Sequence, residues 1–137
     1  MRLAAMLQYC IPGVPCVYYG DEVGMDGYRD PFNRGCYPWG DEDIALREWY
    51  AGLGKLRAQT PALVAGSYLP WHMAEELLMF ERRAAESHLL CAVNRGAWEH
   101  RVPLPENWQR VPLAFGNGFC DGRELVLPPY SGVILVK

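Results

Sequence analysis

The sequence has no marked excess of charge of either sign and no long apolar run. It contains 13 lysine and arginine residues against 16 aspartate and glutamate residues, interspersed along 137 positions, so its net charge is -3 at neutral pH. Binding to nucleic acid and polybasic attachment to a membrane both need clustered positive charge, so neither is expected. The apolar runs are also far shorter than the roughly 20 residues that cross a membrane.

Paired cysteines and metal-ligand spacings are missing as well. Five cysteines are scattered without a Cys-x-x-Cys pair, and three histidines, at 72, 88 and 100, lack the spacing of zinc ligands. The chain opens without a signal-peptide pattern, because Gln8, Tyr9 and Pro12 interrupt its short apolar start. We therefore expect reduced thiols, a cytoplasmic location, and neither a metal ion nor another cofactor.

Several common catalytic signatures are absent. The sequence has no Gly-x-Ser-x-Gly elbow, no phosphate-binding glycine loop and no dinucleotide fingerprint. It is nevertheless 50% apolar, so a chain of this length can bury a substantial core.

An apolar run followed by a loop rich in glycine, charge and aromatic residues is the most distinctive stretch. The run, residues 14–19, is bounded by Gly13 and Gly20, which is typical of a parallel strand buried on both faces. The loop, residues 20–40, has neither helical nor alternating periodicity, and long loops of this kind often carry function. Loops that follow such strands hold substrate in α/β enzymes.

Helices are predicted on either side of this stretch. Apolar residues recur at helical spacing in residues 2–10, which should form an amphipathic helix that ends before Pro12. A second helix should begin after the acidic residues 41–43 and end at Thr60, because the residue before a proline is disfavoured in a helix.

After about Leu63 short apolar runs alternate with turn residues, which predicts a small antiparallel sandwich. The candidate strands are residues 77–80, 89–93, 102–104, 111–115, 125–127 and 133–136. Residues that tolerate positive φ in hairpin turns lie at 94–96, 116–118 and 121–122.

Several short motifs resemble the end of the barrel in the α-amylase family of glycoside hydrolases, most nearly its neopullulanase and cyclomaltodextrinase branch. They are Pro12-Gly-Val-Pro15, Tyr18-Tyr-Gly-Asp-Glu22, Asp30-Pro-x-x-Arg34 and Pro38-Trp39. The resemblance implies the last strand, loop and helix of a (β/α)8 barrel in residues 1–63, followed by an antiparallel β-sandwich domain in residues 64–137. Because a whole barrel needs roughly 250 residues, only its C-terminal piece is expected here.

Asp21 and Glu22 invite comparison with the two carboxylates that glycosidases use. Adjacent residues that leave a strand point to opposite sides, so this pair should not face one substrate atom. We favour a structural role, in which one carboxylate hydrogen-bonds the loop.

Asp30 and Arg34 form a better candidate site. Asp30-Pro-Phe-Asn33 suits a type I turn, which would bring the two ends together. The two side chains could then bind neighbouring sugar hydroxyls or simply pair with each other, and the residues alone favour neither reading. In the resembled branch, the matching Asp and Arg contact a glucose unit on the non-reducing side of the cleaved bond. The family pattern often has a second basic residue after this arginine, whereas Gly35 and Cys36 stand here.

Aromatic residues offer flat faces for sugar rings at several positions. Trp39 is a candidate substrate-binding residue, although we favour a role in which it anchors the loop by packing on the next helix. Further candidates are Tyr28, Phe32 and Tyr37 in the loop, and Trp71, Trp98 and Trp108 in or beside the β-region. For the tryptophans of the β-region, core packing is a sufficient explanation, with a sugar platform as the alternative.

The motifs that carry the family's nucleophile, general acid and stabilising aspartate do not occur in this sequence. The resemblance therefore implies a fragment of a retaining α-glucan hydrolase, which cleaves α-1,4 or α-1,6 bonds in maltooligosaccharides, cyclodextrins or pullulan. An α-glucan oligosaccharide is the expected partner, no catalytic residue is expected, and calcium in the parent enzyme is left open. Two other hypotheses are a non-catalytic glucan-binding module, and a structural fragment that self-associates through its unpaired barrel strand.

Overall fold

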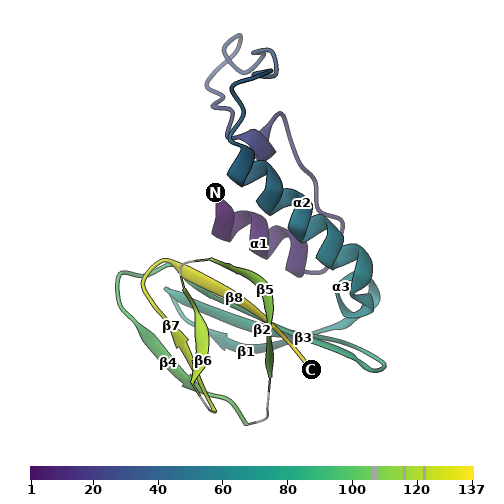
Figure 1. Cartoon of the computed structure of the whole chain (residues 1–137), viewed down its shortest axis with the longest axis vertical. Coiled ribbons are helices and arrows are strands. Elements are labelled where there is room, and N and C mark those ends of the chain that lie inside the picture. Colours follow the sequence, from purple (N-terminus) through teal and green to yellow (C-terminus); the bar gives the residue numbers. More distant parts are fainter. Residues whose placement is uncertain (106–107, 116, 122) are drawn as a thin grey trace.

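The computed structural model describes residues 1–105, 108–115, 117–121 and 123–137. Helices α1 (Arg2–Cys10) and α2 (Ile44–Gln59) lie over one face of a β-sheet, and the loop between them projects away from that sheet (Figure 1). The remaining elements are η1 (Asp21–Val23), α3 (Pro61–Ala65), β1 (Ser67–Met73), β2 (Leu77–Ala84), β3 (Ser87–Asn94), β4 (His100–Pro103), β5 (Gln109–Phe115), β6 (Phe119–Asp121), β7 (Glu124–Leu127) and β8 (Ser131–Val136).

The helices form where the sequence predicts them. Met6 and Cys10 of α1 are fully buried, which confirms the amphipathic helix predicted over residues 2–10. α2 begins after Asp43, whose carboxylate accepts a hydrogen bond from the Leu46 amide at 2.9 Å. It ends before Thr60 as predicted, but the next residue starts the unpredicted short helix α3, because proline suits a first helical position. None of the helices within the described residues is long and apolar enough to cross a membrane.

Two arginines cap the C-terminal end of α1. Arg82 of β2 is fully buried and donates hydrogen bonds to the carbonyls of Cys10 at 2.8 Å and Gly66 at 2.9 Å. Arg57 of α2 donates to the Tyr9 carbonyl at 2.6 Å. Positive charge stabilises a helix C-terminus, where the last carbonyls have no partner within the helix. The two arginines therefore tie α1 to both α2 and β2.

Two antiparallel sheets make up the second half of the chain. The larger sheet has the order β1-β2-β3-β8-β5, and the smaller one has the order β4-β7-β6. Each of the six predicted runs overlaps a strand, but β1 and β6 were not predicted. β1 is a mostly exposed edge strand that contains Pro70 and a bulge, and β6 has 3 residues, so neither carries a clear apolar pattern.

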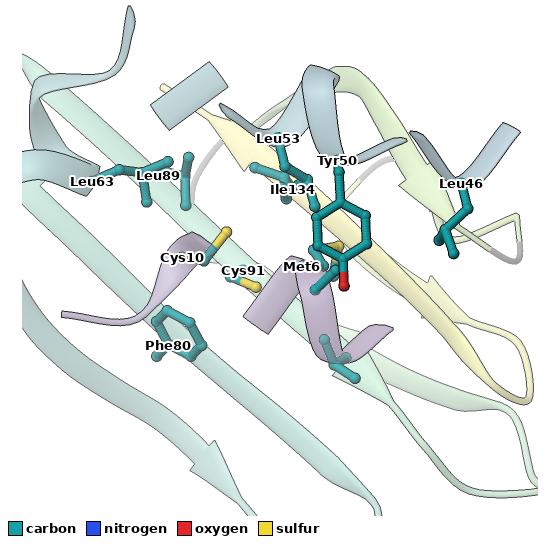
Figure 2. Packing of buried hydrophobic residues seen from close by; sticks show 12 residues of the cluster. Met6, Cys10, Leu46, Tyr50, Leu53, Leu63, Phe80, Leu89, Cys91 and Ile134 are labelled. Carbon is teal, nitrogen blue, oxygen red and sulfur yellow. The ribbon is translucent and has the colours of Figure 1, made fainter. Parts of the chain in front are cut away.

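The central strands β2, β3 and β8 of the larger sheet are buried on both faces. Phe80, Leu89 and Cys91 belong to the core under α1 and α2 that Figure 2 shows. Met79 and Leu90, their neighbours in sequence, pack in a second core with residues of the smaller sheet. Successive residues of a strand point to opposite faces, so burial on both faces explains why β3 is apolar at consecutive positions.

The strand predicted over residues 14–19 does not form, which corrects the sequence expectation. Residues 14–18 have no regular secondary structure, and the side chains of Val14 and Tyr18 are 93% and 68% exposed. A strand needs a neighbour to satisfy its amide and carbonyl groups. Within the described residues every strand lies between Ser67 and Val136, and none of them pairs with this run. The apolar run is therefore an exposed arm in this chain.

The turn predictions have different outcomes. Residues 94–96 do not close a hairpin, because they lead from β3 in the larger sheet to β4 in the smaller one. Instead, the side-chain amide of the buried Asn94 donates hydrogen bonds to the carbonyls of Leu127 at 3.1 Å and Pro128 at 2.9 Å, which joins the two sheets. In the other two predicted turns, residues 116 and 122 lie outside the described residues.

Candidate functional site

The loop between η1 and α2 carries the three residues predicted to bind substrate, Asp30, Arg34 and Trp39. It starts where Gly20 and Gly24, both with positive φ, flank the single turn of η1. It then extends beyond the N-terminal end of α2, away from both sheets (Figure 1). Side chains at its far end are consequently open to solvent.

Asp21 has the structural role that the sequence favoured. Its carboxylate accepts a hydrogen bond from the Tyr18 amide at 3.2 Å, and its own amide donates to the Tyr18 carbonyl at 3.0 Å. η1 lies against α2, so the negative charge of Asp21 adds to burial in raising the pKa of the Tyr50 phenol. Asp21 therefore fixes the start of the loop.

The structure brings Asp30 and Arg34 together. Arg34 Nε lies 2.7 Å from Asp30 Oδ1, and the two side chains are 61% (Asp30) and 73% (Arg34) exposed. The turn differs from the expected one: hydrogen bonds run from the Phe32 amide to the Arg29 carbonyl at 2.9 Å and from the Arg34 amide to the Pro31 carbonyl at 3.1 Å. An ion pair this exposed contributes only about 0–1 kcal/mol, so a ligand can displace it at little cost.

Trp39 is 83% exposed, which corrects the favoured expectation that it anchors the loop by packing on the next helix. Its ring lies 4.6 Å from the ring of Tyr37, at an angle of 50°. The structure thus pairs Trp39 with Tyr37 on the same loop. Tyr28 and Phe32 are also largely exposed, so the loop presents several aromatic faces to solvent.

The tryptophans of the β-region fall into two groups. Trp71 donates from Nε1 to the fully buried carboxylate of Glu81 at 3.2 Å, and its ring lies 6.1 Å from that of the buried Trp108. Core packing therefore explains Trp71 and Trp108. Trp98, in contrast, is 74% exposed and is accessible to a ligand.

Within 1–105, 108–115, 117–121 and 123–137, no three His, Cys, Asp or Glu side chains gather in a way that could hold a metal ion. The absence of a metal or another cofactor remains a prediction from the sequence.

Sequence comparison finds relatives that match almost the whole chain, although no family model matches it. The chain is 32% identical to neopullulanase 2 of Thermoactinomyces vulgaris over 150 residues, which is 98% of this chain and 25% of the relative. It is 34% identical to an amylopullulanase of Thermoanaerobacterium saccharolyticum over 158 aligned residues, which is 100% of this chain and 12% of the relative. A cyclomaltodextrinase of Thermoanaerobacter pseudethanolicus is 30% identical over 98% of this chain and 24% of its own length.

Solved structures of two further enzymes superpose on almost the whole chain. A debranching enzyme from Nostoc punctiforme, in crystals soaked with acarbose, superposes with a TM-score of 0.80 at 27% identity, over 99% of this chain and 28% of that one. A cyclic α-maltosyl-(1→6)-maltose hydrolase from Arthrobacter globiformis superposes with a TM-score of 0.79 at 26% identity, over 99% of this chain and 30% of that one. The chain therefore spans less than a third of the length of each of these relatives and solved structures.

Proposed function

The chain is related over almost its whole length to α-amylase-family glycoside hydrolases of the neopullulanase and cyclomaltodextrinase type, and we propose that it carries part of the sugar-binding loop of such an enzyme. The parent reaction is retaining cleavage of α-1,4 or α-1,6 glucosidic bonds in maltooligosaccharides, cyclodextrins or pullulan. In this proposal the residues that perform the chemistry lie outside this chain, and Asp30 and Arg34 bind sugar.

Residues 1–63 are proposed to be the C-terminal piece of a (β/α)8 barrel, and residues 64–137 to be the β-sandwich domain that follows it. The exposed arm, residues 14–18, supports the first part of the proposal. An apolar segment with both faces apolar is suited to a position between two parallel strands, and here it has no such neighbours among the described residues. In the intact enzyme, those neighbours would come from the rest of the barrel.

The observation that carries the function is the exposed pair of Asp30 and Arg34 on the projecting loop. A carboxylate accepts hydrogen bonds from hydroxyl groups, and a guanidinium donates several in a fixed planar geometry. Adjacent hydroxyls of a glucose ring present donors and acceptors side by side, which matches this pair. The exposed Trp39 ring, on the same loop, offers an apolar face to a sugar ring.

A binding titration tests this function. The 137-residue chain is titrated with maltoheptaose by isothermal calorimetry, and Asp30→Ala and Arg34→Ala should each weaken binding by roughly tenfold or more, since each loses hydrogen bonds to a charged group. Arg101→Ala is the matched control, because Arg101 also forms exposed ion pairs, with Glu99 at 2.8 Å and Glu124 at 3.1 Å, on β4 in the smaller sheet. Equal affinity of Asp30→Ala and the unaltered chain would refute the proposed site.

Enzyme activity provides a second test. Because the family's catalytic motifs are missing from this sequence, the purified chain should not hydrolyse maltotriose, pullulan or cyclodextrin. Measurable turnover that survives further purification would show that the chain contains catalytic carboxylates of its own.

A non-catalytic glucan-binding module is the second candidate function, and the 74% exposure of Trp98 favours it. In that case Trp98→Ala should abolish retention on immobilised amylose, whereas Asp30→Ala should leave it unchanged. The opposite result would support the loop site.

Two accompanying proposals concern the cellular location and the self-association of the chain. Cys10, Cys16, Cys36 and Cys91 form no disulfide bond, which supports a reducing cytoplasmic location. The exposed arm also supports self-association, because an exposed apolar segment that pairs with no strand of the described residues can pair with a second chain.

A further inference from the structure

A contact between residues 16 positions apart closes the base of the projecting loop. The Tyr19 hydroxyl donates a hydrogen bond to the Gly35 carbonyl at 2.8 Å. Tyr19 itself has a φ of 49°, in the left-handed region that bulky residues seldom adopt. Such outliers persist only where the surrounding structure holds them, and they are frequent near functional sites.

Two glycines and a methionine complete this contact. A side chain at Gly35 would place its Cβ 3.2 Å from the Tyr19 hydroxyl oxygen and 3.6 Å from the Met25 methyl carbon. Gly20 has a φ of 76° and lies directly against the Met25 side chain. The backbone amide of Met25 donates a hydrogen bond to the Gly20 carbonyl at 3.1 Å. We call Tyr19, Gly20, Met25 and Gly35 the loop clasp.

The clasp depends on a glycine at position 35. Gly35 directly follows Arg34 in the sequence. Any larger side chain at this position must push against the Tyr19 hydroxyl. The glycine therefore allows Tyr19 to reach the backbone directly beside Arg34.

We propose that Tyr19 is a positioning residue that holds the backbone at Arg34 and Gly35, so that Arg34 and Asp30 face a bound α-glucan together. This inference rests on the proposed function. The ion pair cannot fix the loop by itself, because both of its side chains are largely exposed and such pairs are weak. The clasp instead connects Gly35 to a segment that the Asp21–Tyr18 hydrogen bonds already hold.

The test removes one oxygen atom. Tyr19→Phe keeps the ring and loses the hydroxyl, and loss of a neutral hydrogen bond should weaken maltoheptaose binding by about 3- to 10-fold. The melting temperature should stay close to that of the unaltered chain, because the bond lies in an exposed loop. Tyr18→Phe is the matched control, since Tyr18 is the preceding residue and its side chain is 68% exposed.

A second variant approaches the same contact from the other side. Gly35→Ala places a methyl group against the Tyr19 hydroxyl, so it should weaken binding in the same way. The combined Tyr19→Phe and Gly35→Ala variant should bind nearly as well as either single variant, because both remove one interaction. Additive losses would overturn the proposed contact.

A measurement without ligand separates this inference from the proposed function. The Arg34 amide donates to the Pro31 carbonyl at 3.1 Å, and its exchange with solvent, followed by NMR, should become several-fold faster in Tyr19→Phe. If the unaltered chain binds no glucan, the proposed function fails, and unchanged exchange would still overturn the clasp. If the chain binds glucan and Tyr19→Phe binds equally well, the positioning role is wrong.

Discussion

Replacing Arg82 with methionine tests how the helices are held on the larger sheet. Arg82 is 1% exposed and donates to the carbonyls of Cys10, Gly66 and Ser67 at 2.8, 2.9 and 3.3 Å. Burial lowers the pKa of its guanidinium, and the nearby charge of Arg57 lowers it further. The side chain therefore carries a desolvated charge that its carbonyl partners must compensate.

The expected loss follows from these contacts. Arg82→Met leaves the buried Cys10 carbonyl and the partly buried Gly66 carbonyl without their close donors, at about 1–3 kcal/mol for a buried unsatisfied group. Removing a desolvated charge and burying a methionine side chain return part of this energy. We expect a net loss of about 3 kcal/mol, which is a large share of the 5–15 kcal/mol that stabilises a typical domain.

Urea unfolding followed by tryptophan fluorescence measures the loss. With a denaturant slope of about 2 kcal/mol per molar, the midpoint should fall by roughly 1.5 M. The urea midpoint of Arg82→Lys should lie between those of the unaltered chain and of Arg82→Met. A lysine ammonium keeps the charge but lacks the planar group that donates to several carbonyls at once. Arg101→Met, at an exposed ion pair, should change the midpoint little. If Arg82→Met were as stable as Arg101→Met, the capping role of Arg82 would be refuted.

Three further changes test other parts of the molecule. A hydrogen bond with Cys10, and to a lesser extent burial, holds the pKa of the Cys91 thiol well above its ordinary value of 9.0. Above that pH the unfolded chain releases a proton that the native state keeps, so stability is complete below about pH 9 and then falls by about 1.4 kcal/mol per pH unit. Cys91→Ala should remove this slope in urea midpoints measured up to about pH 10, whereas Cys16→Ala, at an exposed thiol, should retain it. Val14→Lys should change the stability by no more than about 0.5 kcal/mol, because Val14 is 93% exposed, and should lower any self-association seen by light scattering; a loss above about 1.5 kcal/mol would mean that the arm is buried. Leu53→Ala should cost about 2–5 kcal/mol in urea unfolding, since Leu53 of α2 is fully buried in the core between the helices and the larger sheet, and a loss below about 1 kcal/mol would contradict the core described here.

Elements with a strong local pattern were predictable. Residues 2–10 form α1 as predicted, because an amphipathic helix repeats its apolar residues every three to four positions whatever it packs against. The runs at 89–93 and 133–136 lie within β3 and β8, which are apolar at consecutive positions because both faces of the sheet are covered. β1 could not be found in this way, because an exposed edge strand with a proline leaves little apolar signal.

The arm at residues 14–18 shows where a local pattern is insufficient. The same apolar run would suit a buried strand in a complete barrel, and it is exposed in this chain. The pattern describes which surroundings the segment tolerates, whereas strand formation depends on neighbours that lie far away in sequence or in another part of a longer protein.

The sequence by itself determined the periodic elements, the motifs of the loop and the relation to α-glucan hydrolases, since each depends on residues that lie close together in the chain. Tertiary structure alone decided that Asp30 and Arg34 pair on an exposed loop, that Trp39 faces solvent beside Tyr37, and that Tyr19 reaches Gly35. These outcomes depend on where the backbone turns and on which surfaces other elements leave uncovered. The spacing of residues along the chain predicts neither the turns of the backbone nor the surfaces that stay uncovered.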